Sequence, residues 1–146
     1  MSNQNYAHVN DLLAAGQLNW VSDSILALLV SDAAFDVADT RLSDVGARLR
    51  SSAPIQGRWL GEGGMAMGLP ATFNQVAADQ EYQVIVAKDD GGGNPLVLSF
   101  INEDTEGTPI SVQRGGSLIV RPTQENLPVP PETMEPPPTT GFWMKL

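Results

Sequence analysis

The chain has 146 residues, a length that favours one domain with a single hydrophobic core. Its 8 basic and 17 acidic residues give a net charge of -9, and the basic residues are scattered, so we expect no direct nucleic-acid partner. The absence of cysteine excludes disulfides and thiolate metal sites and is compatible with synthesis in a reducing cytoplasm. No apolar run approaches the roughly 20 residues of a membrane span, and no signal peptide is apparent, so we expect no membrane partner.

The first segment predicts one short helix of about ten residues. Asn5 is a candidate N-cap, and Tyr6, Val9 and Leu13 follow at helical spacing. Gly16 stands where a left-handed helix terminator belongs. We therefore expect one N-terminal helix ahead of the rest of the domain.

The next segment, Ser24–Val30, is a nearly unbroken apolar run of strand length. A helix is the alternative, because leucine and alanine favour helices. Turn-prone pairs at Ser22-Asp23 and Ser31-Asp32 bound the run, which favours a strand covered on both faces.

The stretch that follows is expected to be irregular, with one helical turn at Leu42–Val45. Ala47–Ile55 then alternates between polar and apolar residues, which predicts a strand with Leu49 and Ala53 facing the core.

The second half of the chain predicts a series of short strands. Tyr82–Ala87 and Leu96–Ile101 alternate on either side of the loop Asp89–Asn94, which predicts a β-hairpin. A second pair of runs is separated by Gln113–Gly116, whose paired glycines suit a bulge or a tight bend. Further strands are expected at Arg58–Leu60, Met65–Met67, Ala71–Val76, Ile110–Val112, Ser117–Val120 and Phe142–Lys145. About eight or nine strands at turn-rich spacing predict a mainly β fold, an antiparallel β-sandwich of jelly-roll or immunoglobulin-like type.

Proline dominates the segment Pro122–Thr140, which contains seven of the eleven prolines. This composition predicts an extended, solvated strap, because proline lacks the backbone donor and fixes φ. We therefore expect a β-sandwich domain at residues 1–121, a strap at 122–140 and a terminal apolar strand at 141–146. The terminal strand is expected to dock on its own domain or on a neighbouring subunit, with self-docking slightly favoured, through the side chains of Phe142, Trp143, Met144 and Leu146.

The residues that could carry catalysis are few. His8 is the only histidine, and no Gly-x-Ser-x-Gly elbow is present, so His8 is interpreted as a surface or packing residue. Glu103, Asp104 and Glu106 form an acidic turn; a glycosidase pair would also need an aromatic cleft, so a solvated turn is favoured. We expect no enzymatic activity and no catalytic residue.

Two loops resemble ligand-binding motifs in part. The loop Asp89–Asn94 contains oxygen ligands and glycines but lacks the spacing of an EF-hand, so a hairpin loop is favoured over a calcium site. Gly61–Ala66 fits a Gly-x-Gly-x-x-Ala dinucleotide pattern without the surrounding βαβ unit, which favours a glycine-rich turn between strands. The sequence therefore predicts no cofactor and no metal.

A series of short segments follows a recognisable order along the chain. These are Leu18-Asn19-Trp20, Ser22–Ile25, Ala27–Val30, Leu42–Val45, Ala47-Arg48, Val84–Asp89, Pro95-Leu96, Gly107–Ile110 and Gly115–Val120. With the terminal Gly141–Leu146, close to a Gly-aromatic-x-Leu strand, this order resembles small virion proteins of tailed bacteriophages. The resemblance covers most of residues 5–121 and the terminus, and the proline strap departs from it as an insertion before the last strand.

The resemblance implies a non-enzymatic structural component of the virion, made in the host cytoplasm. Its expected place is head or capsid decoration, or a head-fibre, collar or tail-accessory anchor. Its expected partners are other virion proteins, namely capsid, collar or tail subunits, and further copies of itself in a homo-oligomer. The alternative is a carbohydrate-binding adhesion module on the virion surface that uses an exposed Trp20 or Trp59. A small hydrolase around Glu103 is the least favoured hypothesis.

Overall fold

The computed structural model describes residues 3–69, 71–76, 81–101, 110–111, 116–120, 126–129 and 141–146. The described residues are mainly β with few helices, and their strand pairs are antiparallel. The predicted mainly β, antiparallel class is therefore confirmed.

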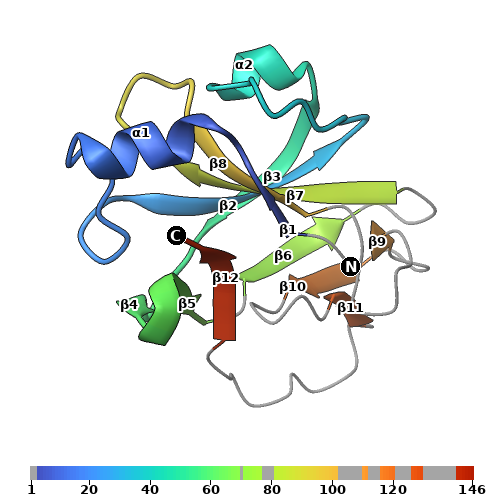
Figure 1. The fold of residues 1–146 in the computed structure, drawn as a ribbon. Helices are drawn as coiled ribbons and strands as arrows, with labels where there is room; N and C mark the ends of the chain where they lie inside the picture. Colours follow the sequence, from blue (N-terminus) through green and yellow to red (C-terminus); the bar gives the residue numbers. More distant parts are fainter. Residues whose placement is uncertain are drawn as a thin grey trace.

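One large sheet forms the upper layer in Figure 1. Its strands, in spatial order, are β1 (Asn3–Asn5), β8 (Leu96–Ile101), β7 (Glu81–Lys88), β2 (Ile25–Ser31) and β3 (Arg48–Pro54), with β9 (Ile110–Ser111) paired to β7 off this path. The predicted hairpin is confirmed as β7 and β8, and the apolar run of the first half is confirmed as β2, an interior strand of the sheet between β7 and β3.

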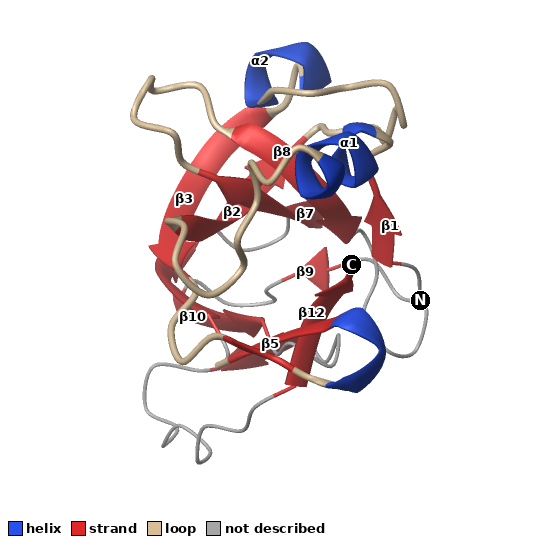
Figure 2. Cartoon of the chain, turned by 60° about the vertical axis from the view of Figure 1, so that its left-hand side comes forward, coloured by secondary structure: helices blue, strands red, loops and turns tan. Residues whose placement is uncertain are grey.

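Two three-stranded sheets lie on one side of the large sheet, and α2 lies on the other side (Figures 1 and 2). The first contains β11 (Asn126–Val129), β10 (Gly116–Val120) and β6 (Ala71–Val76), and the second contains β12 (Gly141–Lys145), β5 (Met65–Gly68) and β4 (Trp59–Leu60). Strands β9 and β10 do not pair with each other, since β9 pairs with β7 and β10 with β6 and β11. A register shift follows Gly116, as the paired glycines predict.

The helical elements are short. They are α1 (His8–Ala14), α2 (Leu42–Val45) and a 3-10 turn, η1 (Glu62–Gly64). The helical turn α2 is confirmed, and Gly16 takes a left-handed φ of 69° after α1. The predicted N-cap at Asn5 is wrong, because Asn5 is the last residue of β1 and pairs with Ser99, so the helix begins after Ala7.

Both faces of the large sheet are covered, which explains the continuous apolar runs of its central strands. The core between the layers includes Ala27, Leu29, Val84 and Val86 of the large sheet and receives Phe73 from β6. The opposite face has its own core, whose buried members are Tyr6, Leu28, Val30, Ile85, Ala87, Val97 and Phe100, packed with residues of α2 and the preceding loop.

The expected inward position of Leu49 is wrong, and a β-bulge is the reason. Leu29 pairs with Ser51 and Val30 with Leu49, so Arg50 is an extra residue in β3. The bulge moves Leu49 to the face opposite that of Ala53, at the edge of the sheet, where it is 52% exposed.

Some expectations fall outside the described residues. These are the acidic turn at Glu103, Asp104 and Glu106, and the strap at residues 122–125 and 130–140. The remaining strap residues form β11, which is the edge strand of its sheet among the described strands, a position where a proline such as Pro128 is tolerated.

Candidate docking surface

The sheet of β12, β5 and β4 brings the terminal apolar segment together with three of the exposed large apolar side chains of the described residues. In β12, Phe142 lies opposite Met67 of β5, and Met144 opposite Ala66. On the other side of β5, the two residues of β4, Trp59 and Leu60, pair with the same two partners. The terminal strand therefore pairs within its own chain and completes a sheet whose other margin is β4.

Two of the four predicted docking residues are fully buried. Trp143 and Met144 have no exposed surface and belong to the core between the layers. The indole Nε1 of Trp143 donates a hydrogen bond to the carbonyl of Leu69, 3.2 Å away. Leu146 is half-buried against the same core, whereas the side chain of Phe142 lies outside the part of the chain that is described.

Gly64 allows the last residue to pack against η1. Its φ is +78°, a left-handed conformation, and its carbonyl accepts a hydrogen bond from the backbone N–H of Leu146 at 2.7 Å. A Cβ at position 64 would lie 2.6 Å from the carbonyl oxygen of Leu146. The predicted glycine-rich turn between strands is confirmed here, since η1 joins β4 to β5.

The expectation that Trp20 is exposed is wrong. Trp20 is 1% exposed, and its Nε1 donates a hydrogen bond to the carbonyl of Met67 at 2.8 Å. An indole held in this way packs in the core and has no free face for a sugar ring.

Three apolar side chains around β4 remain exposed, and we call them the edge patch. They are Trp59, Leu60 and Met65, with exposed fractions of 46%, 53% and 38%. Strand β4 is the last strand of its sheet and pairs only with β5 among the described strands. An unpaired edge beside exposed apolar side chains is a typical site of strand addition or subunit contact.

Arg58, directly before β4, fixes the position of this edge. Its guanidinium donates hydrogen bonds to the carbonyls of Trp20, Val21, Asp23 and Ile55. Partial burial lowers the pKa of Arg58, and the negative charge of Asp23 acts in the opposite direction. One side chain thus ties the start of β4 to two other segments, so the edge patch has a rigid support.

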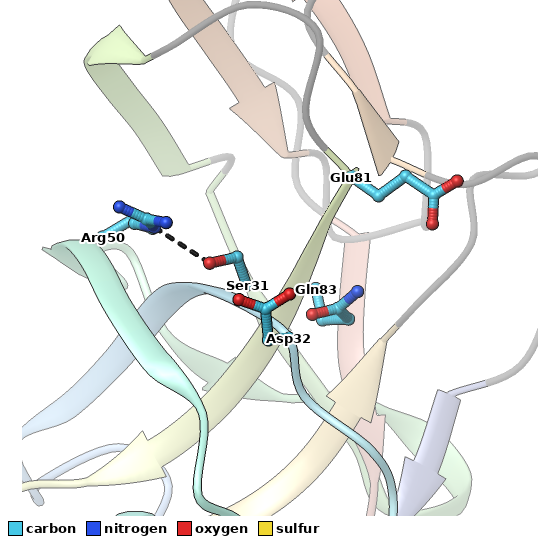
Figure 3. A pocket seen from close by; sticks show the side chains of 5 residues that line it. All are labelled: Ser31, Asp32, Arg50, Glu81 and Gln83. Atoms are coloured by element: carbon cyan, nitrogen blue, oxygen red, sulfur yellow. Dashed lines mark hydrogen bonds between the residues drawn. The ribbon is translucent and has the colours of Figure 1, made fainter.

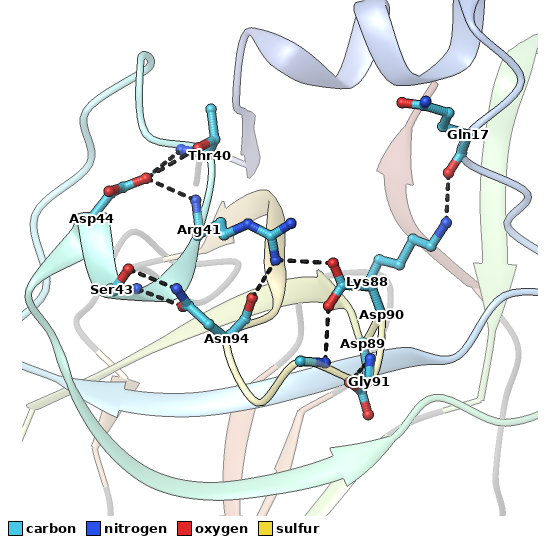
Figure 4. A network of polar contacts seen from close by, with 11 residues as sticks. Gln17, Thr40, Arg41, Ser43, Asp44, Lys88, Asp89, Asp90, Gly91 and Asn94 are labelled. Atoms are coloured by element: carbon cyan, nitrogen blue, oxygen red, sulfur yellow. Dashed lines mark hydrogen bonds and ion pairs between the residues drawn. The ribbon is translucent and has the colours of Figure 1, made fainter.

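The polar side chains of the loop Asp89–Asn94 form hydrogen bonds and an ion pair with other residues of the chain (Figure 4). Asp90 forms a 2.9 Å ion pair with Arg41, and this hydrogen bond holds the pKa of Asp90 below its usual value. Asn94 accepts from the backbone N–H of Ser43 at 3.0 Å and donates to its hydroxyl at 2.8 Å. These contacts fasten the hairpin loop to α2.

The described residues that could serve catalysis or metal binding are His8 and the carboxylates. The Nε2 of His8 donates a hydrogen bond to the carbonyl of Val97, which places the ring in a packing role. Among the described side chains, no three histidine, aspartate or glutamate groups lie close enough together to hold a metal ion. No helix in the described ranges is long and apolar enough to cross a lipid bilayer.

Comparisons with known proteins found that the chain matches no protein family, no curated protein and no solved structure.

The edge patch itself was missed by reasoning from the sequence. The sequence places Trp59, Leu60 and Met65 in expected strands and marks Trp59 as a possible sugar-stacking residue, but it does not indicate that the three are exposed together. The available signal was a two-residue strand that contains two large apolar residues and is followed by glycines, because such a strand has little room to bury both side chains.

Proposed function

We propose that this chain is a non-enzymatic structural component of a tailed-phage virion, either a capsid-decorating protein or an anchor for a fibre, collar or tail accessory. In this proposal the large sheet and the two small sheets form a β-sandwich of jelly-roll or immunoglobulin-like type. The protein acts through contacts with other virion subunits and with further copies of itself.

The observation that carries the proposal is the edge patch on β4, the edge strand of its sheet among the described strands. Trp59 and Leu60 are both about half exposed, although large apolar side chains gain free energy from burial. Because Trp143 and Met144 already fill the core of their own chain, the terminal strand is not available for a neighbour in this conformation. The edge of β4 is then the surface on which a neighbouring subunit would add its contacts.

The first test is self-association of the full chain by sedimentation equilibrium. Leu60→Lys and Trp59→Glu should shift an oligomer toward monomer, because each places a charge in the proposed contact. Val37→Lys is the matched control, since Val37 is 51% exposed in a loop far along the chain from β4. A protein whose oligomeric state is the same in all four forms would contradict a role for the edge patch in self-association.

The second test addresses the virion itself. Particles purified on a density gradient from cells that carry the gene should contain the protein in many copies per particle by quantitative mass spectrometry. Particles without the protein, recovered from cells that synthesise it, would contradict the structural role.

A carbohydrate-binding adhesion module is the second candidate, and the exposed ring of Trp59 favours it. A half-exposed indole can stack on the apolar face of a sugar ring. Glycan binding would change the fluorescence of the wild-type protein and not that of Trp59→Phe, since the other described tryptophans, Trp20 and Trp143, are buried.

A further inference from the structure

A polar pocket lies at one margin of the large sheet, at the end of β2 and the start of β7. Its volume is about 270 Å³, and its lining residues are Ser31, Asp32, Arg50, Glu81 and Gln83. Figure 3 shows that they come from three neighbouring strands and the turn after β2. The volume lies near the lower limit for small-ligand sites, roughly 300 Å³, so the pocket suits a ligand of about one small ring.

The bulge in β3 places a positive group in this pocket. Arg50 is the extra residue between the pairs Leu29–Ser51 and Val30–Leu49. Its Nε donates a hydrogen bond to the hydroxyl of Ser31 at 2.9 Å, and Ser31 is only 4% exposed. The remaining guanidinium nitrogens, Nη1 and Nη2, form no hydrogen bond with another described residue, so two nitrogens that carry four N–H groups are available to a ligand.

The turn after β2 adds an acceptor, Asp32, and β7 adds a second kind of donor, Gln83. Asp32 takes a left-handed φ of 59°, a conformation that aspartate tolerates better than most residues. The side-chain oxygen of Gln83 accepts a hydrogen bond from the backbone N–H of Ala33 at 3.1 Å, which assigns its amide nitrogen as a donor. Figure 3 shows Asp32 between Ser31 and Gln83, whereas the carboxylate of Glu81 points away from Arg50.

The charges of the lining residues decide the class of ligand. Asp32 and Glu81 disfavour an anion, and the guanidinium of Arg50 disfavours a metal ion or an organic cation. A hydroxyl group, in contrast, both donates and accepts, so it can satisfy a carboxylate and a guanidinium or amide donor at once. We infer that this pocket binds a small neutral polyhydroxyl compound, such as one sugar ring, through Asp32, Arg50 and Gln83.

This inference is independent of the proposed assembly role and uses a different surface from Trp59. None of the described lining residues is aromatic, so hydrogen bonds would provide most of the affinity. Binding is therefore expected to be weak in solution and to gain strength where many copies are displayed together.

The test is a two-dimensional ¹H–¹⁵N NMR titration of the full chain with glucose, galactose, mannose and N-acetylglucosamine. Inorganic phosphate and calcium chloride serve as the anionic and cationic probes. At least one neutral sugar should cause saturable shifts at the amides of residues 31–33, 50 and 81–83, whereas the ions should cause none that saturate. Saturable binding of phosphate or calcium in place of every sugar would overturn the inferred ligand class.

Two variants connect the binding to the pocket. Asp32→Asn keeps a residue that accepts a left-handed φ, and Arg50→Gln removes the guanidinium; each should weaken sugar binding by about tenfold. Arg48→Gln is the matched control, because Arg48 is an exposed arginine of the same strand that does not line the pocket. Melting curves establish that each variant is folded. Sugar binding that persists unchanged in both folded pocket variants, or no saturable binding of any sugar by the wild type, would overturn the inference.

Discussion

Gly68 lies against the ring of Trp143 so closely that a Cβ at position 68 would be 3.2 Å from both Cδ1 and Nε1 of the indole. The same Cβ would be 2.8 Å from Cγ2 of Ile55, which is buried. Strand β5 therefore accepts the terminal strand only because this position has no side chain. The self-docked terminus depends on a glycine that precedes it by more than seventy residues.

Gly68→Ala is expected to lower the free energy of unfolding by about 1–3 kcal/mol, because the added methyl group overpacks the contact between Ile55 and Trp143. Chemical denaturation followed by circular dichroism measures the change. Gly92→Ala is the control, since a Cβ there meets only a carboxylate oxygen of Asp90, at 3.4 Å. Equal stability of the two variants would show that β12 adjusts freely to β5.

Trp143→Ala is expected to lower the free energy of unfolding by about 3–5 kcal/mol, because it leaves a cavity in the core between the layers. Deletion of residues 141–146 should be at least as damaging, since it also exposes an edge of β5. Thermal denaturation checks both changes. A truncated protein with an unchanged melting temperature would contradict self-docking of the terminal strand.

Arg58→Met is expected to lower the free energy of unfolding by about 2–4 kcal/mol, because four backbone carbonyls lose a charged donor. Arg58→Lys should be intermediate, since an ammonium group keeps the charge but cannot reproduce the planar fork of donors. Arg48→Met, at an exposed position of β3, provides the control for loss of a surface arginine. The contradicting outcome is a loss no greater in Arg58→Met than in this control.

Tyr6→Phe is expected to leave the stability unchanged or to raise it. The hydroxyl of Tyr6 is buried and has no hydrogen-bond partner among the described residues, while its ring packs 5.0 Å from that of Phe35. Burial, with smaller effects from Asp39 and Asp36, raises the pKa of the phenol. Removal of the hydroxyl keeps the ring contact and relieves an unsatisfied polar group. Tyr6→Leu, which removes the ring as well, should be destabilising; a loss in Tyr6→Phe as large as in Tyr6→Leu would refute the interpretation.

Acid should weaken the fold partly through Asp44. The pKa of its carboxylate is lowered first by the hydrogen bond from the backbone N–H of Arg41 and then by those from Thr40. Because the folded-state pKa lies below the unfolded one, the stabilisation is present above about pH 4 and is lost as the pH falls through the folded-state value. Asp44→Asn should therefore reduce the loss of stability between about pH 5 and about pH 2, as measured by urea denaturation.

Asp39 provides a contrast of opposite sign. Its pKa is raised, first by desolvation and then by the charges of Asp36 and Asp44. Its ionised form therefore disfavours the folded state, and Asp39→Asn should increase stability at neutral pH. If Asp39→Asn and Asp44→Asn change the pH dependence in the same direction, the electrostatic assignment of this loop is wrong.

The sequence predicted the strands whose ends are marked by neighbouring turn residues. The run that became β2 was readable because turn residues bound it on both sides, and the β7–β8 hairpin because its two halves flank a glycine-rich loop. The position of Leu49 was not predictable, because the alternation of polar and apolar residues does not show that Arg50 is an extra residue in a bulge. The burial of Trp20 likewise depends on the distant carbonyl of Met67.

The candidate sites show the same limit. The burial of Trp143 and Met144 could be predicted from composition, because an apolar segment that follows a solvated, proline-rich one must bury its side chains somewhere. The edge patch and the polar pocket arise only when strands from different parts of the chain become neighbours. Arg50 and Asp32 are ordinary polar residues in the sequence, and the pairing of β2 with β3 is what places them together.

The interior position of β2, between β3 and β7, also bears on how the protein aggregates when it is heated. Its apolar, β-prone run has the character of an aggregation-prone segment, and in the folded state both of its edges are occupied, by β3 and β7. Asp23 and Asp32 flank the run as charged gatekeepers, and Asp23 pairs with Lys88 at 3.1 Å. When the protein unfolds, this run is exposed and only the two flanking aspartates oppose its association with other molecules. The fraction of protein that refolds after heating should therefore decline steeply as the protein concentration rises.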